Sequence, residues 1–233
     1  YGCIIGDEAH LFKAKSLTDI MARSADWKYR CGLTGTLDGT QTHRLVLEGL
    51  FGKVTQVTTT KELMDDETLA KLDIDCVVLK HTDEECKRIK KYTYAEELNY
   101  IVSHTKRNKF IENLCKTIKG NTLVLFQLVD KHGVLLHNEI KKLDKKVFFV
   151  YGGTTTETRE KIRGIVEKEK DSLIIASYGT FSTGINIRNI NNIVFASPSK
   201  SKIRVLQSIG RGLRKMENKS VVRLFDIADN ASY

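Results

Sequence analysis

The chain has 233 residues, of which 41% are hydrophobic and 29% are charged, and this composition excludes the disordered and fibrous classes. Its 38 basic and 29 acidic residues give a formal net charge of +9, which favours polyanionic partners such as nucleic acid or an anionic membrane surface. The five cysteines form no Cys-x-x-Cys pair, and no apolar run approaches the roughly 18 residues of a membrane-spanning helix. We therefore expect a soluble intracellular protein with reduced thiols.

Short apolar runs alternate along the chain with polar segments of helical length, which predicts an α/β fold around a mostly parallel sheet. In chain order, the predicted strands are residues 3–5, 29–33, 74–79, 122–126, 146–150, 172–176, 193–196 and 221–226. The predicted helices are residues 95–118, 131–143, 156–169 and 202–214. The stretch from about 58 to 72 is polar and acidic, so we divide the chain into residues 1–66 and 67–233; the alternative is a surface helix within one domain.

Two adjacent carboxylates, Asp7 and Glu8, follow the first strand in the run Asp7-Glu8-Ala9-His10. Ligands bind at the carboxyl edge of parallel sheets. There Asp7 could hold a magnesium ion that bridges nucleotide phosphates, Glu8 could orient and deprotonate the attacking water, and His10 could link this motif to the next. An acidic helix N-cap explains the same residues equally well.

The second strand is followed by small and hydroxyl residues in the run Gly32-Leu33-Thr34-Gly35-Thr36. Glycine allows the backbone to approach a neighbour, and the hydroxyls of Thr34 and Thr36 can donate hydrogen bonds. Taken alone, this is more often a structural turn than a catalytic one.

A third polar run, residues 176–186, follows the strand at 172–176 and contains Ser177, Thr183, Gly184 and Asn186. Its hydroxyls and glycines suit contacts with phosphate oxygens of a nucleotide or a nucleic-acid strand. An ordinary polar loop is the alternative.

The fourth motif, Gln207-Ser208-Ile209-Gly210-Arg211-Gly212-Leu213-Arg214, is the most specific. A helix would place Arg211, Arg214 and Gln207 on one face. Two planar guanidinium groups on one face can clamp a phosphate. A merely solvated basic helix is less well supported, because Gly210 and Gly212 are poor helix formers.

In this order the four motifs resemble motifs II, III, V and VI of DEAH-type superfamily 2 helicases. The residues Val124-Leu125-Phe126 lie where motif IV would be, and Tyr151-Gly152-Gly153-Thr154 resembles a turn that contacts the nucleic-acid backbone. The similarity covers nearly the whole chain. The amino-acid sequence of residues 29–37 and 50–52 is most similar to that of the UvsW-type DNA helicases of T-even bacteriophages.

The resemblance implies tandem RecA-like (P-loop NTPase) lobes, with ATP and Mg²⁺ bound in the cleft between them. Residues 1–66 would be the C-terminal part of the first lobe and residues 67–233 the second lobe. The implied catalytic and nucleotide-site residues are Asp7 and Glu8 at the magnesium, His10 beside them, Gln207 at the reacting phosphate, Arg211 and Arg214 as arginine fingers, and Gly184 and Asn186 near the ribose. Thr34 and Thr36 would couple the sites, and Phe126, Gly153, Thr154, Ser177 and Thr183 would contact nucleic acid. Motif III here has Thr-Gly-Thr where many relatives have Thr-Ala-Thr or Ser-Ala-Thr.

No Gly-Lys-Ser or Gly-Lys-Thr of a P-loop occurs in the sequence. The family places that loop upstream of the DEAH motif, so we expect an incomplete first lobe and a chain that does not hydrolyse ATP alone. The implied partner is DNA, either branched or at single-strand/duplex junctions, with no membrane. We expect a monomer in the cytoplasm of a bacterial host cell. The alternatives are an RNA helicase, a restriction-enzyme motor subunit, or a nucleic-acid-binding module without catalysis.

Overall fold

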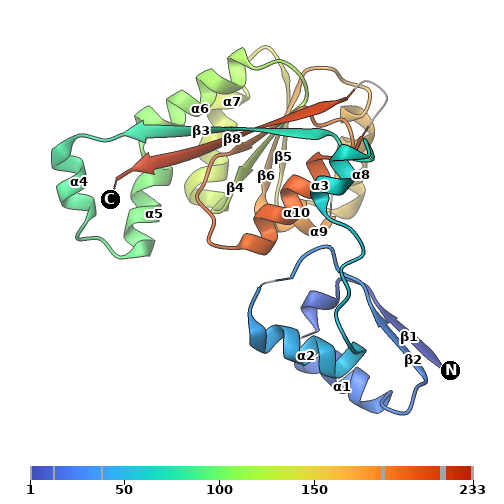
Figure 1. Cartoon of the computed structure of the whole chain (residues 1–233). Coiled ribbons are helices and arrows are strands. Elements are labelled where there is room, and N and C mark those ends of the chain that lie inside the picture. The colour runs from blue at the N-terminus through green and yellow to red at the C-terminus, as the bar shows by residue number, and fades with distance from the viewer. Residues whose placement is uncertain (1, 13, 38, 185–186, 216–218, 232–233) are drawn as a thin grey trace.

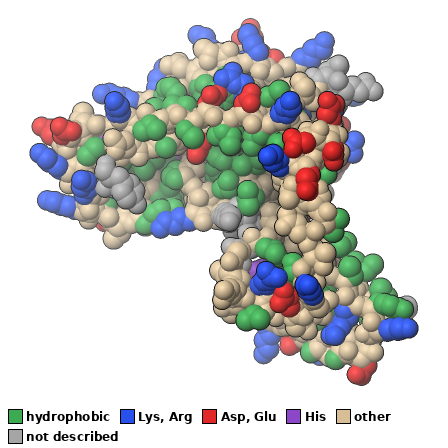
Figure 2. Space-filling view, in the orientation of Figure 1, with side chains coloured by type: hydrophobic (Ala, Val, Ile, Leu, Met, Phe, Trp, Pro, Cys, Tyr) green, Lys and Arg blue, Asp and Glu red, His purple; other side chains and the backbone are tan. Residues whose placement is uncertain are grey.

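The computed structural model describes residues 2–12, 14–37, 39–184, 187–215 and 219–231, without the side chains of 182–184 and 202–204. A smaller N-terminal body and a larger C-terminal body are joined by a narrow connection (Figures 1 and 2). This connection, residues 52–59, contains no helix or strand. None of the helices in the described ranges is long and apolar enough to cross a membrane.

The smaller body is built on a parallel pair of strands whose carboxyl ends lie side by side, with Gly6 opposite Gly32. Its elements are β1 (Cys3–Gly6), the 3₁₀ turn η1 (Ala9–Leu11), α1 (Lys15–Arg23), β2 (Tyr29–Gly32) and α2 (Gln41–Phe51). A Cβ at position 32 would meet the Phe51 ring at 2.9 Å, so glycine is needed for α2 to pack on the sheet.

The larger body contains a six-stranded sheet in the order β3-β8-β7-β4-β6-β5, with every pair parallel. Its strands are β3 (Lys71–Lys80), β4 (Thr122–Phe126), β5 (Lys146–Val150), β6 (Ser172–Ser177), β7 (Asn192–Phe195) and β8 (Val221–Asn230). All eight strands predicted across the two bodies are present, and the predicted α/β fold with mostly parallel sheets is confirmed.

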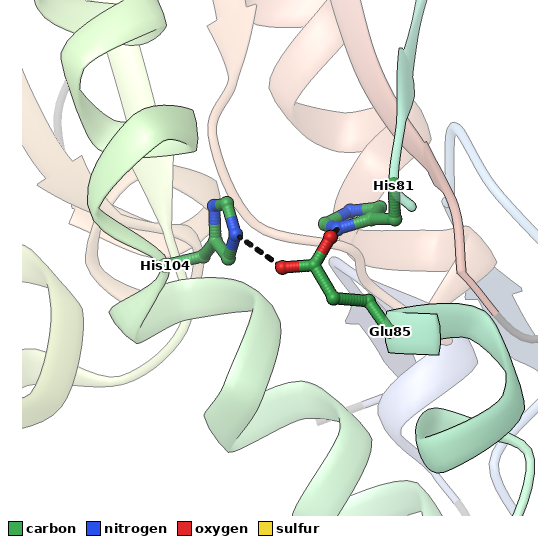
Figure 3. A group of neighbouring side chains, drawn as sticks. All are labelled: His81, Glu85 and His104. Carbon is green, nitrogen blue, oxygen red and sulfur yellow. Dashed lines mark ion pairs between the residues drawn. The ribbon is translucent and has the colours of Figure 1, made fainter. Parts of the chain in front are cut away.

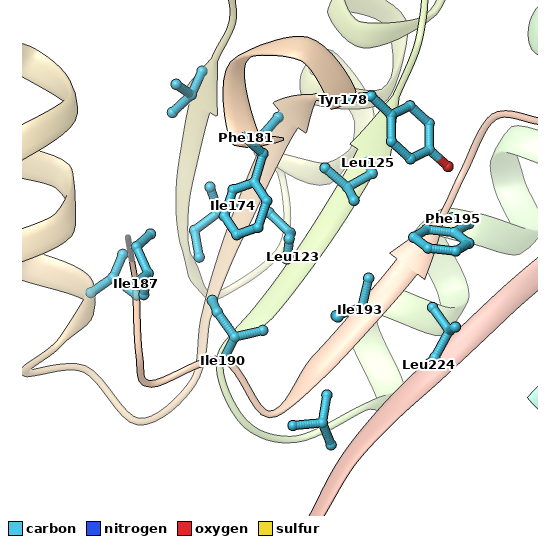
Figure 4. Close-up of a cluster of buried hydrophobic side chains, with 14 of the residues drawn as sticks. Leu123, Leu125, Ile174, Tyr178, Phe181, Ile187, Ile190, Ile193, Phe195 and Leu224 are labelled. Atoms are coloured by element: carbon cyan, nitrogen blue, oxygen red, sulfur yellow. The ribbon is translucent and has the colours of Figure 1, made fainter. Parts of the chain in front are cut away.

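Helices cover both faces of the larger sheet. They are α3 (Thr60–Asp65), α4 (Asp83–Ile89), α5 (Tyr94–Ser103), α6 (Thr105–Thr117), the π-helix η2 (Val129–Gly133), α7 (Val134–Ile140), α8 (Thr156–Val166), α9 (Tyr178–Gly184) and α10 (Lys202–Gly212). Alternate strand residues point to opposite faces. Leu123 and Leu125 therefore join a core with α8 and α9 (Figure 4), and Val124 and Phe126 join a second core with α6 and α7.

The single helix predicted for residues 95–118 is wrong, because the chain forms two helices, α5 and α6, that break at His104. His104 has an extended backbone (φ −69°, ψ 114°), and its Nδ1 accepts a hydrogen bond from the N–H of Arg107. The imidazole thus caps α6, although histidine is not among the usual capping residues.

The join between the two bodies lies close to the predicted division at residues 66 and 67. Met64 and Leu69 already pack against the core of the larger body, and the N–H of Ala70 donates to the carbonyl of Leu213 at 2.9 Å. This packing favours residues 52–59 as the join, and the division into folding units remains a proposal.

Burial of His132 predicts that the free energy of unfolding falls in acid. The ring of His132 is fully buried between Ser197 and Asn108, and burial, with a smaller effect from the Arg107 charge, lowers the pKa of His132 to about 3. Because the unfolded chain takes up this proton near pH 6.5, the stabilisation is complete above that pH and is lost as the pH falls toward 3. Between pH 6.5 and 4.5, urea unfolding should show wild type losing about 2 kcal/mol more than His132→Gln. Equal losses would contradict this.

Candidate functional site

The acidic pair lies in a tight turn directly after β1. Glu8 adopts a left-handed backbone (φ 48°, ψ 47°), and the Asp7 Oδ1 atom accepts the N–H of Glu8 at 2.8 Å. Such conformations are uncommon for a residue with a side chain and cluster at functional sites. Asp7 is exposed and Glu8 is half-buried, so both carboxylates are accessible at the carboxyl edge of the β1–β2 sheet.

His10 connects the acidic turn to the motif after β2. Its buried Nδ1 lies 2.9 Å from Thr34 Oγ1 and 3.2 Å from Glu8 Oε2. The Thr34 hydroxyl donates its own hydrogen to the Thr36 carbonyl at 2.9 Å. Both groups that face Nδ1 are therefore acceptors, and the ring proton belongs on Nδ1. The expected link between His10 and the second motif is present.

The Thr36 hydroxyl oxygen is buried and has no hydrogen-bond partner among the described residues. Leaving such a group unpaired costs about 1–3 kcal/mol. Unpaired buried polar atoms are rare in native proteins and require an explanation. Thr36 belongs to the second motif, to which the resemblance assigns a coupling role.

The fourth motif forms the C-terminal part of α10 and continues beyond it. Val205 and Ile209 pack against the core of the larger body. At 100° per residue, Gln207 and Arg211 lie on the opposite side of the helix from Val205 and Ile209. The helix therefore presents Gln207 and Arg211 away from its own core, and Arg214 follows its last residue.

Arg211 of the larger body interacts electrostatically with Glu8 of the smaller body. Burial, followed by the nearby positive charge of Arg214, lowers the pKa of Arg211, whereas the negative charge of Glu8 raises it. In Figure 1, α10 lies on the side of the larger body that faces the smaller one. The structure therefore brings Glu8, the second residue of the first motif, near Arg211 of the fourth motif, and Arg214 lies near Arg211.

Lys219, which the sequence reasoning missed, supports the end of α10. It is 3% exposed, and its Nζ donates to the carbonyls of Gly212 at 2.6 Å and Arg188 at 2.7 Å. Burial lowers the pKa of Lys219 to about 8, so it remains charged at neutral pH. A cation at a helix C-terminus satisfies carbonyls that the helix leaves unpaired. The sequence holds no signal for this contact, because residues 213–218 separate Lys219 from the end of α10.

The third motif is the helix α9 rather than a loop. The Ser177 hydroxyl lies 2.8 Å from Thr180 Oγ1 and accepts the N–H of Thr180 at 3.4 Å, as an N-capping residue does. The backbone of Gly184 ends this helix. The side chain of Thr183 and the whole of Asn186 lie outside the described residues.

The turn after β5 is held by its own residues. The Thr154 N–H donates to the Tyr151 carbonyl at 2.9 Å, and Thr154 Oγ1 accepts the N–H of Tyr151 at 3.1 Å. Arg159, which the sequence reasoning did not select, donates to the carbonyls of Tyr151 and Gly152. Gly153 is exposed, so the backbone of this turn is accessible to a ligand.

The structure buries the side chain of Phe126, which was expected to contact nucleic acid. Its side chain is fully buried and stacks on Phe149 with ring centroids 5.6 Å apart. A Cβ at Gly133 would come within 2.5 Å of the Phe126 ring, so the π-helix packs directly on it. Phe126 therefore belongs to the core.

A depression of about 980 Å³ lies at the end of the larger sheet where its strands begin, beside the segments that precede β4, β6, β7 and β8. Its lining includes Gly120, Lys170, Asn191 and Lys219 but none of the predicted site residues. The candidate site is therefore the region between the two bodies, and this depression is not part of it.

Comparison with known proteins agrees with the fold and the motif order. The model of the helicase conserved C-terminal domain matches residues 105–216. With the similarities that follow, this match agrees with the resemblance to superfamily 2 helicases. The chain is 36% identical to the ATP-dependent DNA helicase UvsW of Enterobacteria phage T4 over 234 residues, which cover 99% of this chain and 46% of UvsW. The chain thus spans about half the length of this relative.

Solved structures show the same architecture. The crystal structure of T4 UvsW matches with a TM-score of 0.61 at 34% identity, over 99% of this chain and 45% of that one. The DNA-bound restriction-modification enzyme LlaBIII matches with a TM-score of 0.59 at 13% identity, over 98% of this chain and 18% of that one. Dbp5 of S. cerevisiae, bound to RNA and ADP BeF3, matches with a TM-score of 0.56 at 14% identity, over 96% and 52%. At these low identities, the last two matches show the fold alone.

Proposed function

We propose that this chain contributes the DEAH and arginine sides of the nucleotide site in an ATP-dependent DNA helicase or translocase. The proposed activity is to unwind or branch-migrate DNA in recombination, repair and replication restart. The similarity to UvsW supports DNA as the substrate. The observation that carries the proposal is the electrostatic interaction of Glu8 with Arg211 across the two bodies, because a nucleotide bound between them would meet both groups.

The acidic turn suits the chemistry of ATP hydrolysis. The exposed Asp7 carboxylate fits a magnesium ion, which prefers one or two carboxylates together with waters and phosphates, and Glu8 lies beside it. When bound, ATP would supply the phosphoryl group, and Mg²⁺ held at Asp7 would offset the negative charge on its oxygens. Glu8 orients the attacking water and removes its proton. His10, with its proton on Nδ1, holds the Glu8 carboxylate and transmits its position to Thr34 and Thr36.

Arg211 and Arg214 make closure of the two bodies depend on bound ATP. Arg211 and Arg214 reach phosphate oxygens when the bodies close on ATP, and Gln207 on the same helical face contacts the reacting phosphate. A ligand shifts a conformational equilibrium only through contacts that differ between the two states, and these guanidinium contacts form in the closed state. The region of Gly184 and Asn186 is proposed to lie near the ribose.

The proposed nucleic-acid contacts are to phosphates and not to bases. The groups assigned to this role are the exposed backbone of Gly153, the turn residue Thr154, Ser177 at the end of β6, and Thr183 of α9. Because the net charge is +9, binding is electrostatic, indifferent to sequence and strongly weakened by salt.

The test of this function is an ATPase assay of the full-length gene product with branched DNA, linear duplex DNA and RNA as separate additions. Stimulation mainly by branched DNA is the expected result. Stronger stimulation by RNA would indicate an RNA helicase, and stimulation by linear duplex alone would indicate a restriction-type motor. Absence of hydrolysis with every polynucleotide would leave a nucleic-acid-binding module and overturn the enzymatic proposal.

Glu8→Gln keeps the size of the side chain but removes the base. ATP hydrolysis should fall by about 10²- to 10⁴-fold, which is the usual contribution of a general base, while binding of a non-hydrolysable ATP analogue stays within a few-fold of wild type. Glu157→Gln is the matched control, because the Glu157 side chain is 77% exposed and forms a surface ion pair with Lys161. Full activity of Glu8→Gln would refute the assigned role.

A further inference from the structure

Three side chains of the types that bind metals, from three different segments, meet at the end of the larger body where β3 and β8 end. His81 follows β3, Glu85 is on α4, and His104 joins α5 to α6 (Figure 3). One ligand atom from each of the three lies within 4.8 Å of the others. The sequence analysis did not select any of these residues, and no step of the proposed ATP hydrolysis uses them.

The proton on His81 is assigned by its neighbour Asp229. The Asp229 carboxylate is 3% exposed; its Oδ2 accepts a hydrogen bond from Arg107 Nε at 2.8 Å, and its Oδ1 lies 3.0 Å from His81 Nε2. A carboxylate that is paired with a guanidinium only accepts hydrogen bonds, so His81 Nε2 is the donor. In the neutral ring, the lone pair is therefore on Nδ1, which faces Glu85 Oε2 at 3.9 Å. A carboxylate that orients a histidine in this way is the usual outer partner of a metal ligand.

Glu85 supplies a firmly held anion between the two imidazoles. Its Oε2 accepts hydrogen bonds from the N–H and the hydroxyl of Thr82 at 2.9 and 3.0 Å, and its Oε1 accepts the Tyr100 hydroxyl at 2.9 Å. These contacts, first of all that with the Thr82 N–H, lower the pKa of Glu85 to about 2. The carboxylate is thus ionised and fixed in position, with the imidazoles of His81 and His104 beside its two oxygens.

The spacing within the cluster is longer than hydrogen bonding requires and close to that of a coordination shell. His104 Nε2 lies 3.5 Å from Glu85 Oε1, and His81 Nδ1 lies 3.9 Å from Glu85 Oε2. Good hydrogen bonds between such groups are shorter than 3.2 Å. Ligand atoms held about 2.0–2.1 Å from a tetrahedral zinc ion are roughly 3.3 Å apart, so small side-chain movements would close the shell.

Metal binding would require one change at His104. Its Nδ1 now accepts the N–H of Arg107 at 3.3 Å, which places the ring proton on Nε2. Coordination through Nε2 transfers that proton to Nδ1 and gives up this long hydrogen bond. A neutral hydrogen bond contributes only about 1 kcal/mol, whereas a bound structural metal contributes considerably more.

We propose that His81 Nδ1, Glu85 and His104 Nε2 form a binding site for a divalent transition-metal ion, with zinc as the best match. Two imidazoles and one carboxylate are typical zinc ligands, and water can complete the tetrahedron. The ion ties α4 and the α5–α6 junction to the ends of β3 and β8. Its role is to stabilise this end of the larger body.

The test uses the purified chain, stripped with a chelator and titrated with Co²⁺ by visible absorption and with Zn²⁺ by thermal unfolding. Saturating zinc should raise the Tm of wild type by about 5 °C or more. His104→Asn keeps a good N-capping residue, yet it should lower Co²⁺ affinity at least tenfold and abolish the Tm shift. Glu85→Gln should weaken binding similarly, and the exposed neighbour Glu84→Gln should behave as wild type.

Two results would overturn the metal site. One is a wild-type Tm that does not change with zinc. The other is a His104→Asn protein that binds Co²⁺ as tightly as wild type, which would place the binding elsewhere in the chain.

Discussion

Arg211→Ala in the full-length protein should lower DNA-stimulated ATP hydrolysis by about 10³- to 10⁵-fold, the usual effect of removing an arginine finger. Arg211 lies on the face of α10 turned away from its own core, and it interacts with Glu8 of the other body. On the proposed function, its guanidinium would supply charge to the transferred phosphoryl group only after the two bodies close on ATP. Steady-state ATPase rates with saturating DNA measure the effect.

Two further variants separate the role of Arg211 from general loss of charge. Arg211→Lys keeps the positive charge but not the planar fork that bonds phosphate oxygens bidentately, so it should remain strongly impaired. Arg163→Ala removes an arginine that pairs with Glu160 and Glu167 on the surface of α8, and it should retain wild-type activity. Wild-type hydrolysis by Arg211→Ala would refute the finger assignment.

Arg107→Met should lower the free energy of unfolding by about 3–5 kcal/mol, because breaking a buried ion pair leaves an uncompensated charge inside the protein. The guanidinium of Arg107 is almost fully buried and donates to Asp229 and to the carbonyls of Ala196 and Ile227. The substitution would remove the cation that pairs with the Asp229 carboxylate and the hydrogen bonds that both carbonyls accept from Arg107. Equilibrium urea unfolding of the purified chain measures the change.

Arg223→Met is the matched control for Arg107→Met. Arg223 also pairs with an aspartate, Asp75 at 2.7 Å, but its side chain is 55% exposed. Exposed pairs contribute about 0–1 kcal/mol, so this variant should remain close to wild type. Equal losses in the two variants would show that burial does not determine the contribution of Arg107.

The strands could be predicted because their local pattern and their final environment agree. Strands β4 and β6 are largely apolar runs, as expected for strands covered by helices on both faces, and the structure buries every residue of the two strands except Ser177. The acidic turn after β1, Arg211 of α10 and Arg214 beyond it were selected because their residue types are suited to phosphate chemistry. Their interaction across the two bodies agrees with that selection.

The features that could not be predicted depend on contacts between distant parts of the chain. The break at His104 requires an imidazole to act as a helix cap, which residue preferences do not favour. The tautomer of His81 is set by Asp229, 148 positions away. Phe126 is the last residue of the apolar run of β4, and the π-helix, which a motif position does not reveal, covers its ring.

The shared nucleotide site is tested most directly by a double-mutant cycle of Glu8→Gln and Arg211→Ala, measured as kcat/KM for ATP in the full-length protein with DNA. If both side chains act on one bound nucleotide, the double variant should lose much less activity than the product of the two single losses, because residues that act as a unit are not additive. Losses that multiply within error would mean that the two groups act independently, and they would contradict a single site formed between the two bodies.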